Sequence, residues 1–189
     1  MRSRAWRSAV KAAKPDWIGV ALDHLKADLE ESGLGRFLGP EVTLVPAPRS
    51  APLSEPGALW PARVICEGLV TRGLGKEVVP CLVRTEAVPK SAFAEAGGRP
   101  TAERHLESMG IEHGIFAPGS ITVVDDIVTI GRTLMASASH LRESFPEAEL
   151  RAFALIHTYG LTPEVDRIDV PYVGALRRTG GWIAHEPPQ

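Results

Sequence analysis

The chain has little cysteine, few aromatic residues and no long uninterrupted run of apolar residues. Cys66 and Cys81 are its only cysteines, and each lies in an apolar setting without further metal ligands nearby in sequence, which favours buried free thiols over a disulfide or a zinc site. No apolar stretch approaches the roughly 20 residues that a membrane-spanning helix needs. Residues 1–15 are basic but lack the apolar core of a secretory signal, so we expect a cytoplasmic protein without a membrane segment.

The chain also lacks a large excess of charge of either sign. A formal net charge of −2 and a pI near 6.3 give no global case for binding nucleic acid or an anionic membrane. One basic cluster stands at the N-terminus, around Trp6, and consists of Arg2, Arg4, Arg7, Lys11 and Lys14. A solvated basic helix or a disordered arm explains this cluster better than a nucleic-acid footprint, which usually needs more positive surface. No complete G-x-x-x-x-G-K-[ST] loop is present, so little supports an NTPase.

The length and the hydrophobic content suit one compact domain over residues 1–189, because 189 residues with 44% hydrophobic content can bury a substantial core. Periodicity and turn residues predict helices at 16–31 and 59–74, and strands at 42–45, 78–83, 121–124 and 150–157. This alternation predicts an α/β fold with a doubly wound, mainly parallel sheet and helices on both faces. A helical segment (1–40) would precede that core, and a C-terminal extension (160–189), with apolar and polar residues alternating near Ile168 and Val170, would add an edge strand or cover a pocket.

Residues 121–134, ITVVDDIVTIGRTL, carry the most chemistry in the chain. A β-branched apolar run is followed by two acids and a turn that opens a helix. The first-turn N–H groups, the helix dipole and the hydroxyls of Thr129 and Thr133 favour an anion, and Gly131 lets the backbone approach it closely. Asp125 and Asp126 must then face something else, and ribose hydroxyls or a hydrated Mg²⁺ suit carboxylates. The alternative is that the acids only cap the helix.

This stretch resembles the signature of type I phosphoribosyltransferases that binds 5-phosphoribosyl 1-diphosphate (PRPP), in which apolar residues, two acids and two further apolar residues precede T-T-G-x-T. The matching residues are Val123, Val124, Asp125, Asp126, Ile127, Val128, Thr129, Gly131 and Thr133. Ile130 departs from the pattern and removes one hydroxyl donor, but it leaves the backbone donors in place. The resemblance implies that Asp125 and Asp126 are catalytic and fix the ribose hydroxyls. It also implies that the 5′-phosphate is held by Thr129, Ile130, Gly131, Arg132 and Thr133.

A second segment, LVPAPRS, is similar to the corresponding part of the competence-protein F-like and amidophosphoribosyltransferase-like subgroup. The resemblance implies a pyrophosphate-binding loop made of Ala47, Pro48, Arg49 and Ser50. The N–H groups of a tight turn and the Ser50 hydroxyl can donate, while Arg49 offers a forked cation. The alternative is a proline-rich turn with a solvated arginine. Ligands of doubly wound sheets bind beyond the carboxyl ends of the strands, so the two loops should meet there.

The polar stretch 86–116 lacks a convincing core strand and is expected to be a flexible lid over the pyrophosphate, with Lys90 and Arg104 as the best candidates for closing contacts. Alternatively, residues 101–109 form only a capped surface helix. His105 is expected to be structural.

The resemblance implies transfer of ribose 5-phosphate from Mg²⁺-bound PRPP to an unidentified base or amine, with release of pyrophosphate. The metal would arrive with PRPP and meet Asp125 and Asp126 through water at most. Tyr159, Tyr172 and Trp182 can stack on a base or pack in the core. Homodimers are common in the resembling enzymes, so a homodimer is an expectation here. The alternatives are a non-catalytic regulator that binds PRPP or a nucleotide and meets its partner through the basic N-terminus, and a protein associated with DNA uptake.

Overall fold

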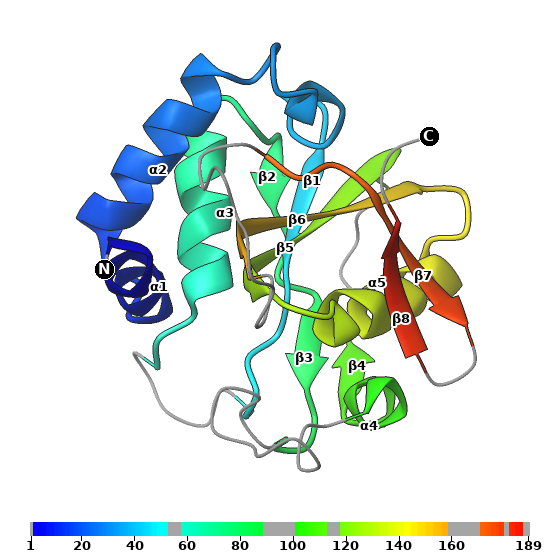
Figure 1. The fold of residues 1–189 in the computed structure, drawn as a ribbon. Helices are drawn as coiled ribbons and strands as arrows, with labels where there is room; N and C mark the ends of the chain where they lie inside the picture. Colours follow the sequence, from blue (N-terminus) through cyan, green and yellow to red (C-terminus); the bar gives the residue numbers. More distant parts are fainter. Residues whose placement is uncertain are drawn as a thin grey trace.

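A computed structural model describes residues 2–52, 58–88, 101–112, 118–158, 171–179 and 182–186. Its centre is a four-stranded parallel sheet with strand order β2-β1-β5-β6 (Figure 1). The strands are β1 (Thr43–Pro46), β2 (Glu77–Val78), β5 (Ser120–Val128) and β6 (Glu149–His157). The predicted α/β fold with a parallel central sheet is therefore confirmed.

Helices cover both faces of this sheet (Figure 1). On one side lie α1 (Arg2–Lys11), α2 (Pro15–Ala27) and α3 (Pro61–Thr71), and on the other lies α5 (Arg132–Ser144). Each face of the sheet packs into its own hydrophobic core, and alternate strand residues point to the two faces. Leu44 and Val124 pack on the side of α2 and α3, whereas Val45 and Val123 pack on the side of α5. Burial on both faces explains why these strands read as continuous apolar runs.

The N-terminal half follows the sequence expectations in part. The basic N-terminus forms a helix whose Ala9 and Val10 are buried, while Arg4 and Arg7 remain exposed. Helix α3 runs from Pro61 to Thr71, within the predicted range 59–74. Helix α2 ends at Ala27, earlier than the predicted residue 31, and turns lead to a short 3₁₀ helix η1 (Leu34–Arg36). The Ser32 hydroxyl donates to the Leu29 carbonyl (3.1 Å), a local bond that competes with helix continuation.

The predicted strand 78–83 is wrong as a single element. Strand β2 ends at Val78, and after Pro80 the chain leaves the central sheet. Proline lacks the N–H group that a ladder bond requires. Strand β3 (Leu82–Arg84) instead pairs antiparallel with β4 (Met109–Ile111), which follows helix α4 (Ala102–Glu107). The described part of the expected lid therefore contains a helix and a strand outside the central sheet, and its closing motion stays a prediction.

Strand β5 is longer than predicted, since it runs to Val128 rather than stopping at Val124. Its pairing with β6 continues to Val128 opposite His157, so Asp125 and Asp126 lie inside the strand and not after it. Strand β1 stops at Pro46, opposite Val124. The carboxyl end of β5 therefore projects beyond that of β1.

The C-terminal part forms a hairpin of β7 (Ala175–Thr179) and β8 (Trp182–Glu186) with a sheet of its own. The predicted edge strand near Ile168 and Val170 lies outside the described residues, as does Tyr159. Cys66 and Cys81 are free and buried, as expected. Among the described helices, none has the length and apolar character to cross a bilayer.

Candidate functional site

The strand order reverses at the carboxyl end of β1. From β1 the chain passes through α3 to β2 on one side, and it later returns to β5 on the other side of β1. Crevices at such switch points are the usual ligand sites of parallel sheets. The Ala47 N–H donates to the Val124 carbonyl (2.8 Å), which places the loop Ala47–Ser50 directly beside Asp125. The two segments singled out in the sequence therefore meet at one place.

Three carbonyl groups of the loop Ala47–Ser50 accept hydrogen bonds from the protein. Trp60 Nε1 donates to the Ala47 carbonyl (2.8 Å) and Arg84 Nε donates to the Arg49 carbonyl (2.8 Å). The Val88 N–H donates to the Ser50 carbonyl (2.7 Å). By contrast, the N–H groups of Arg49 and Ser50 find no acceptor within the described part of the chain. Around Arg49 and Ser50, the carbonyl groups are therefore occupied and the N–H groups have no acceptor among the described residues, an arrangement that suits an anion.

Asp125 and Asp126 form a coupled acid pair beside this loop. Asp125 Oδ1 accepts from the Asp126 N–H, and Asp126 Oδ1 accepts from the Ile127 N–H, each at 2.8 Å. Burial raises the pKa of Asp125 to about 8, and the charge of Asp126 and a hydrogen bond between the two side chains add to that rise. Without a ligand, the pair therefore retains a proton at neutral pH.

A basic residue from the N-terminal helix completes the acid pair. Lys11 Nζ lies 3.3 Å from Asp126 Oδ2, with the lysine side chain 50% exposed and the aspartate side chain 11% exposed. The ammonium group opposes the rise in the pKa of Asp125. Sequence analysis missed this contact, because the composition of α1 does not show which of its bases faces the sheet.

The turn after β5 has the conformation that an anion-binding turn needs. Gly131 has φ +88°, a left-handed value that favours glycine, and it precedes the first turn of α5. Glycine has no side chain to cap the helix, so the first turn of α5 receives no side-chain cap. Thr129 Oγ1 lies 2.7 Å from the hydroxyl of Thr158, which follows β6. Thr158 was missed, because no motif contains it and its contact with Thr129 arises only from the pairing of β5 with β6.

The remaining residues of the turn lie next to Gly131, and their contact with a phosphate stays a prediction. Ile130, Arg132 and Thr133 are partly buried at the start of α5. The positive charge of Arg132 lowers the pKa of His105, which places this arginine within electrostatic reach of α4. Leu176 of β7 packs against Gly131, since a Cβ atom at that glycine would lie 2.8 Å from Leu176 Cδ1.

Helix α4 matches the capped-helix alternative for residues 101–109. The Arg104 N–H donates to Thr101 Oγ1 (3.1 Å), and Arg104 pairs with Glu86 (2.8 Å) at the surface. His105 is buried and structural, as expected: burial and then the charge of Arg84 lower its pKa to about 4, so it is neutral. The second predicted closing residue, Lys90, lies in residues 89–100, outside the described residues.

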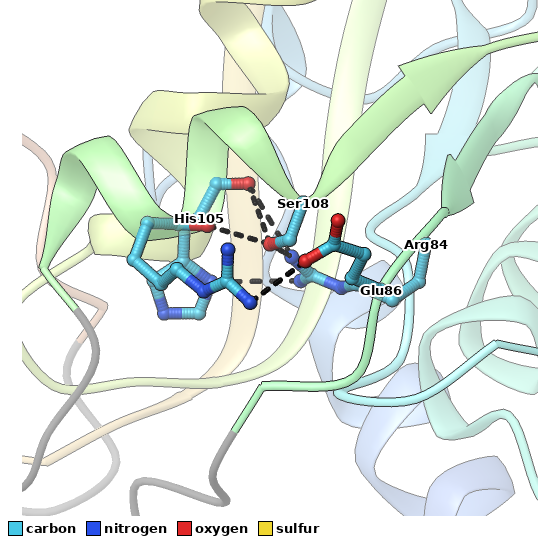
Figure 2. Close-up of polar contacts among 5 residues, drawn as sticks. Arg84, Glu86, His105 and Ser108 are labelled. Atoms are coloured by element: carbon cyan, nitrogen blue, oxygen red, sulfur yellow. Dashed lines mark hydrogen bonds and ion pairs between the residues drawn. The ribbon is translucent and has the colours of Figure 1, made fainter.

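Arg84 links this helix to the loop Ala47–Ser50, because it donates to the Arg49 carbonyl and also to the His105 carbonyl and the Ser108 hydroxyl. Figure 2 shows its contacts on the α4 side. Arg84 was not among the residues predicted from the sequence. No motif contains it, and its role depends on the separation of β3 from the central sheet.

Comparison with models of protein families and with curated proteins gave no match. Residues 2–52, 58–88, 101–112, 118–158, 171–179 and 182–186 contain no group of three or more His, Cys, Asp or Glu side chains able to hold a metal. The acid pair nevertheless fits a hydrated Mg²⁺ that is held mainly by ligand oxygens.

Proposed function

We propose that the protein is a phosphoribosyltransferase that transfers ribose 5-phosphate from Mg²⁺-bound PRPP to a nitrogenous acceptor and releases pyrophosphate. One observation carries this proposal: two segments suited to anions flank a carboxyl pair at the switch point of a parallel sheet. PRPP has the complementary chemistry, because a pentose diol separates its diphosphate from its monophosphate.

Each part of PRPP has a counterpart in this arrangement. The monophosphate is assigned to the turn Thr129–Thr133, where the left-handed Gly131 opens helix α5. The diol is assigned to Asp125 and Asp126. The diphosphate is assigned to the loop Ala47–Ser50, whose free N–H groups and partly buried Arg49 are donors.

The residues would accelerate transfer by positioning and electrostatics. Mg²⁺ bound with PRPP offsets the charge of the diphosphate. Asp125 releases its proton when the sugar hydroxyls donate to the carboxylates. The ionised pair then favours the positive charge that develops on the sugar, and Arg49 stabilises the departing diphosphate.

We expect the double variant Asp125→Asn/Asp126→Asn to lose transfer by at least about 1,000-fold while it keeps the fold, because amides cannot offer the two carboxylate charges. The assay measures pyrophosphate release from Mg²⁺-PRPP with a panel of bases and amines, and circular dichroism checks the fold. Asp23→Asn is the control, since Asp23 is an exposed acid of α2 paired with Arg72. Undiminished turnover in the double variant would overturn the assigned roles.

A second function is favoured by the ion pair between Lys11 and Asp126. This contact connects the basic helix α1 directly to the acid pair. A ligand that binds the acid pair would therefore change the ion pair of Lys11, and a partner bound at α1 would respond to that change. The protein would then be a PRPP- or nucleotide-binding regulator without turnover. Calorimetric binding of Mg²⁺-PRPP without pyrophosphate release across the whole panel would favour the regulator over the transferase.

A further inference from the structure

We infer that Arg84 is a positioning residue that holds the loop Ala47–Ser50 in its anion-binding form and places an unpaired positive charge behind it. This inference rests on the proposed function, because it assigns the loop a diphosphate.

The geometry shows one buried side chain joining three segments. Arg84 is 6% exposed and lies on β3. Its guanidinium donates to the Arg49 carbonyl (2.8 Å), the Ser108 hydroxyl (2.7 Å) and the His105 carbonyl (3.3 Å). Figure 2 shows the Arg84 side chain directed toward His105 and Ser108 at the end of α4. The loop after β1 is therefore fixed to the α4–β4 segment through this arginine.

The hydrogen bond from Arg84 to the Arg49 carbonyl determines what the loop can bind. With the Arg49 carbonyl directed to Arg84 and the Ser50 carbonyl directed to the Val88 N–H, two consecutive acceptors are withdrawn from the ligand side. Acceptor oxygens would repel a phosphate, whereas N–H groups donate to it. Loss of the Arg84 bond frees the Arg49 carbonyl to turn outward.

In the described part of the chain, Arg84 forms no ion pair with a carboxylate. Burial lowers its pKa to about 10, and only the more distant charge of Asp125 opposes that fall. Among the described residues, no carboxylate oxygen lies within 4.0 Å of its guanidinium, and its partners are neutral: two carbonyl groups, one hydroxyl group and the Nδ1 atom of His105 at 3.5 Å. His105 beside it is neutral, and the exposed Arg104 is paired with Glu86. A buried charge without a counter-ion is costly to the fold, and a bound diphosphate would supply the missing anion.

Arg72 shows what a purely structural arginine looks like in the same chain. It also joins separate elements, through bonds to the Gly68 and Gly19 carbonyls at 3.1 and 3.2 Å. Unlike Arg84, it has a carboxylate partner, Asp23, at 2.8 Å. Arg72→Lys is therefore the matched control for loss of a bridging guanidinium.

The test measures calorimetric affinities of wild type, Arg84→Gln, Arg84→Lys and Arg72→Lys for Mg²⁺-pyrophosphate, Mg²⁺-PRPP and ribose 5-phosphate. In Arg84→Gln, we expect affinity for the two diphosphates to fall at least about tenfold, in line with loss of a charge-assisted bond. Affinity for ribose 5-phosphate should stay within about twofold, since it does not use the loop. Arg84→Lys keeps the charge, so its affinity for the two diphosphates should fall less, again without a loss of affinity for ribose 5-phosphate. This variant tests the inference if Arg84→Gln does not fold. Arg72→Lys should bind all three ligands like wild type.

Three results would contradict the inference. Unchanged diphosphate affinity in the Arg84 variants would remove the positioning role, and an equal loss for ribose 5-phosphate would reduce Arg84 to a structural residue. A wild-type protein that binds neither pyrophosphate nor PRPP would overturn the proposed function as well, which separates the two failures.

Discussion

At the scale of single residues, local chemistry made part of the site predictable. Asp125, Asp126 and the residues of the Gly131 turn stand close together in sequence, so their pattern is visible without a structure. Arg84, Thr158 and Lys11 are brought in by tertiary contacts from β3, the end of β6 and α1, and no local pattern marks them. The state of the acid pair was equally invisible, because the raised pKa of Asp125 depends first on burial.

The raised pKa of Asp125 predicts a pH-dependent stability. The pKa of Asp125 in the folded protein, about 8, exceeds its ordinary value of 3.8. The stabilising contribution of the protonated side chain is therefore fully present below about pH 4 and is lost as the pH rises to about 8. The pKa of His105 is lowered to about 4 from 6.5, so the histidine acts in the opposite direction, but only below about pH 6.5. The informative window is therefore pH 6.5 to 8.

In that window, we expect the free energy of unfolding of Asp125→Asn to rise relative to wild type by up to about 1.4 kcal/mol per pH unit, because the amide does not titrate. Urea unfolding of both proteins at the two ends of the window measures this difference. A difference independent of pH would mean that Asp125 is already ionised in the folded protein.

The left-handed turn at Gly131 supports a second prediction at this scale. Gly131→Ala should lower the free energy of unfolding by about 2–3 kcal/mol, because it combines a strained φ with a clash against Leu176. Gly33 is the matched control: its φ is +70° with no neighbouring atom within 4 Å, so Gly33→Ala should cost only about 1 kcal/mol. Denaturant unfolding compares the two, and equal losses would show that Leu176 does not press on the turn.

At the scale of elements, whether a segment is a helix or a strand was easier to predict than where it begins and ends or which strand it pairs with. The apolar runs and the helical spacing located β1, β6, α3 and α5, because burial of one stripe or of both faces leaves a periodic pattern. The pairing of the strands could not be predicted. Pro80 lies inside the strand predicted at 78–83, whereas in the structure it separates β2 from β3. The length of β5 was missed because acids inside a strand look like the start of a loop, and only pairing with β6 overrides that preference.

Helix α1 provides the prediction at this scale. Lys11→Met removes the ammonium that opposes the rise in the pKa of Asp125, so the titration midpoint of the acid pair should move upward. Stability should change by less than about 1 kcal/mol, because the lysine is half exposed. The ¹³C shifts of the aspartate carboxyl groups, followed against pH, measure the midpoint. Lys14→Met is the control, and a midpoint equal to that of wild type in Lys11→Met would mean that α1 does not influence the site.

At the scale of the whole molecule, the site follows from topology. The chain passes from β1 to β2 on one side and later forms β5 on the other side of β1, so the strand order reverses at the carboxyl end of β1. Both conspicuous loops leave the sheet there. The sequence alone indicated the parallel sheet through the alternation of strands and helices. It could not indicate the β3–β4 pair or the C-terminal hairpin, because each depends on contacts between distant segments.

The most direct test of the central claim is a crystal structure of the wild-type protein with Mg²⁺ and excess PRPP. We predict the monophosphate on the turn Thr129–Thr133, the sugar diol against Asp125 and Asp126, and the diphosphate on the loop Ala47–Ser50. A ligand bound elsewhere, or a site in which both carboxyl groups turn away from the sugar, would contradict the account.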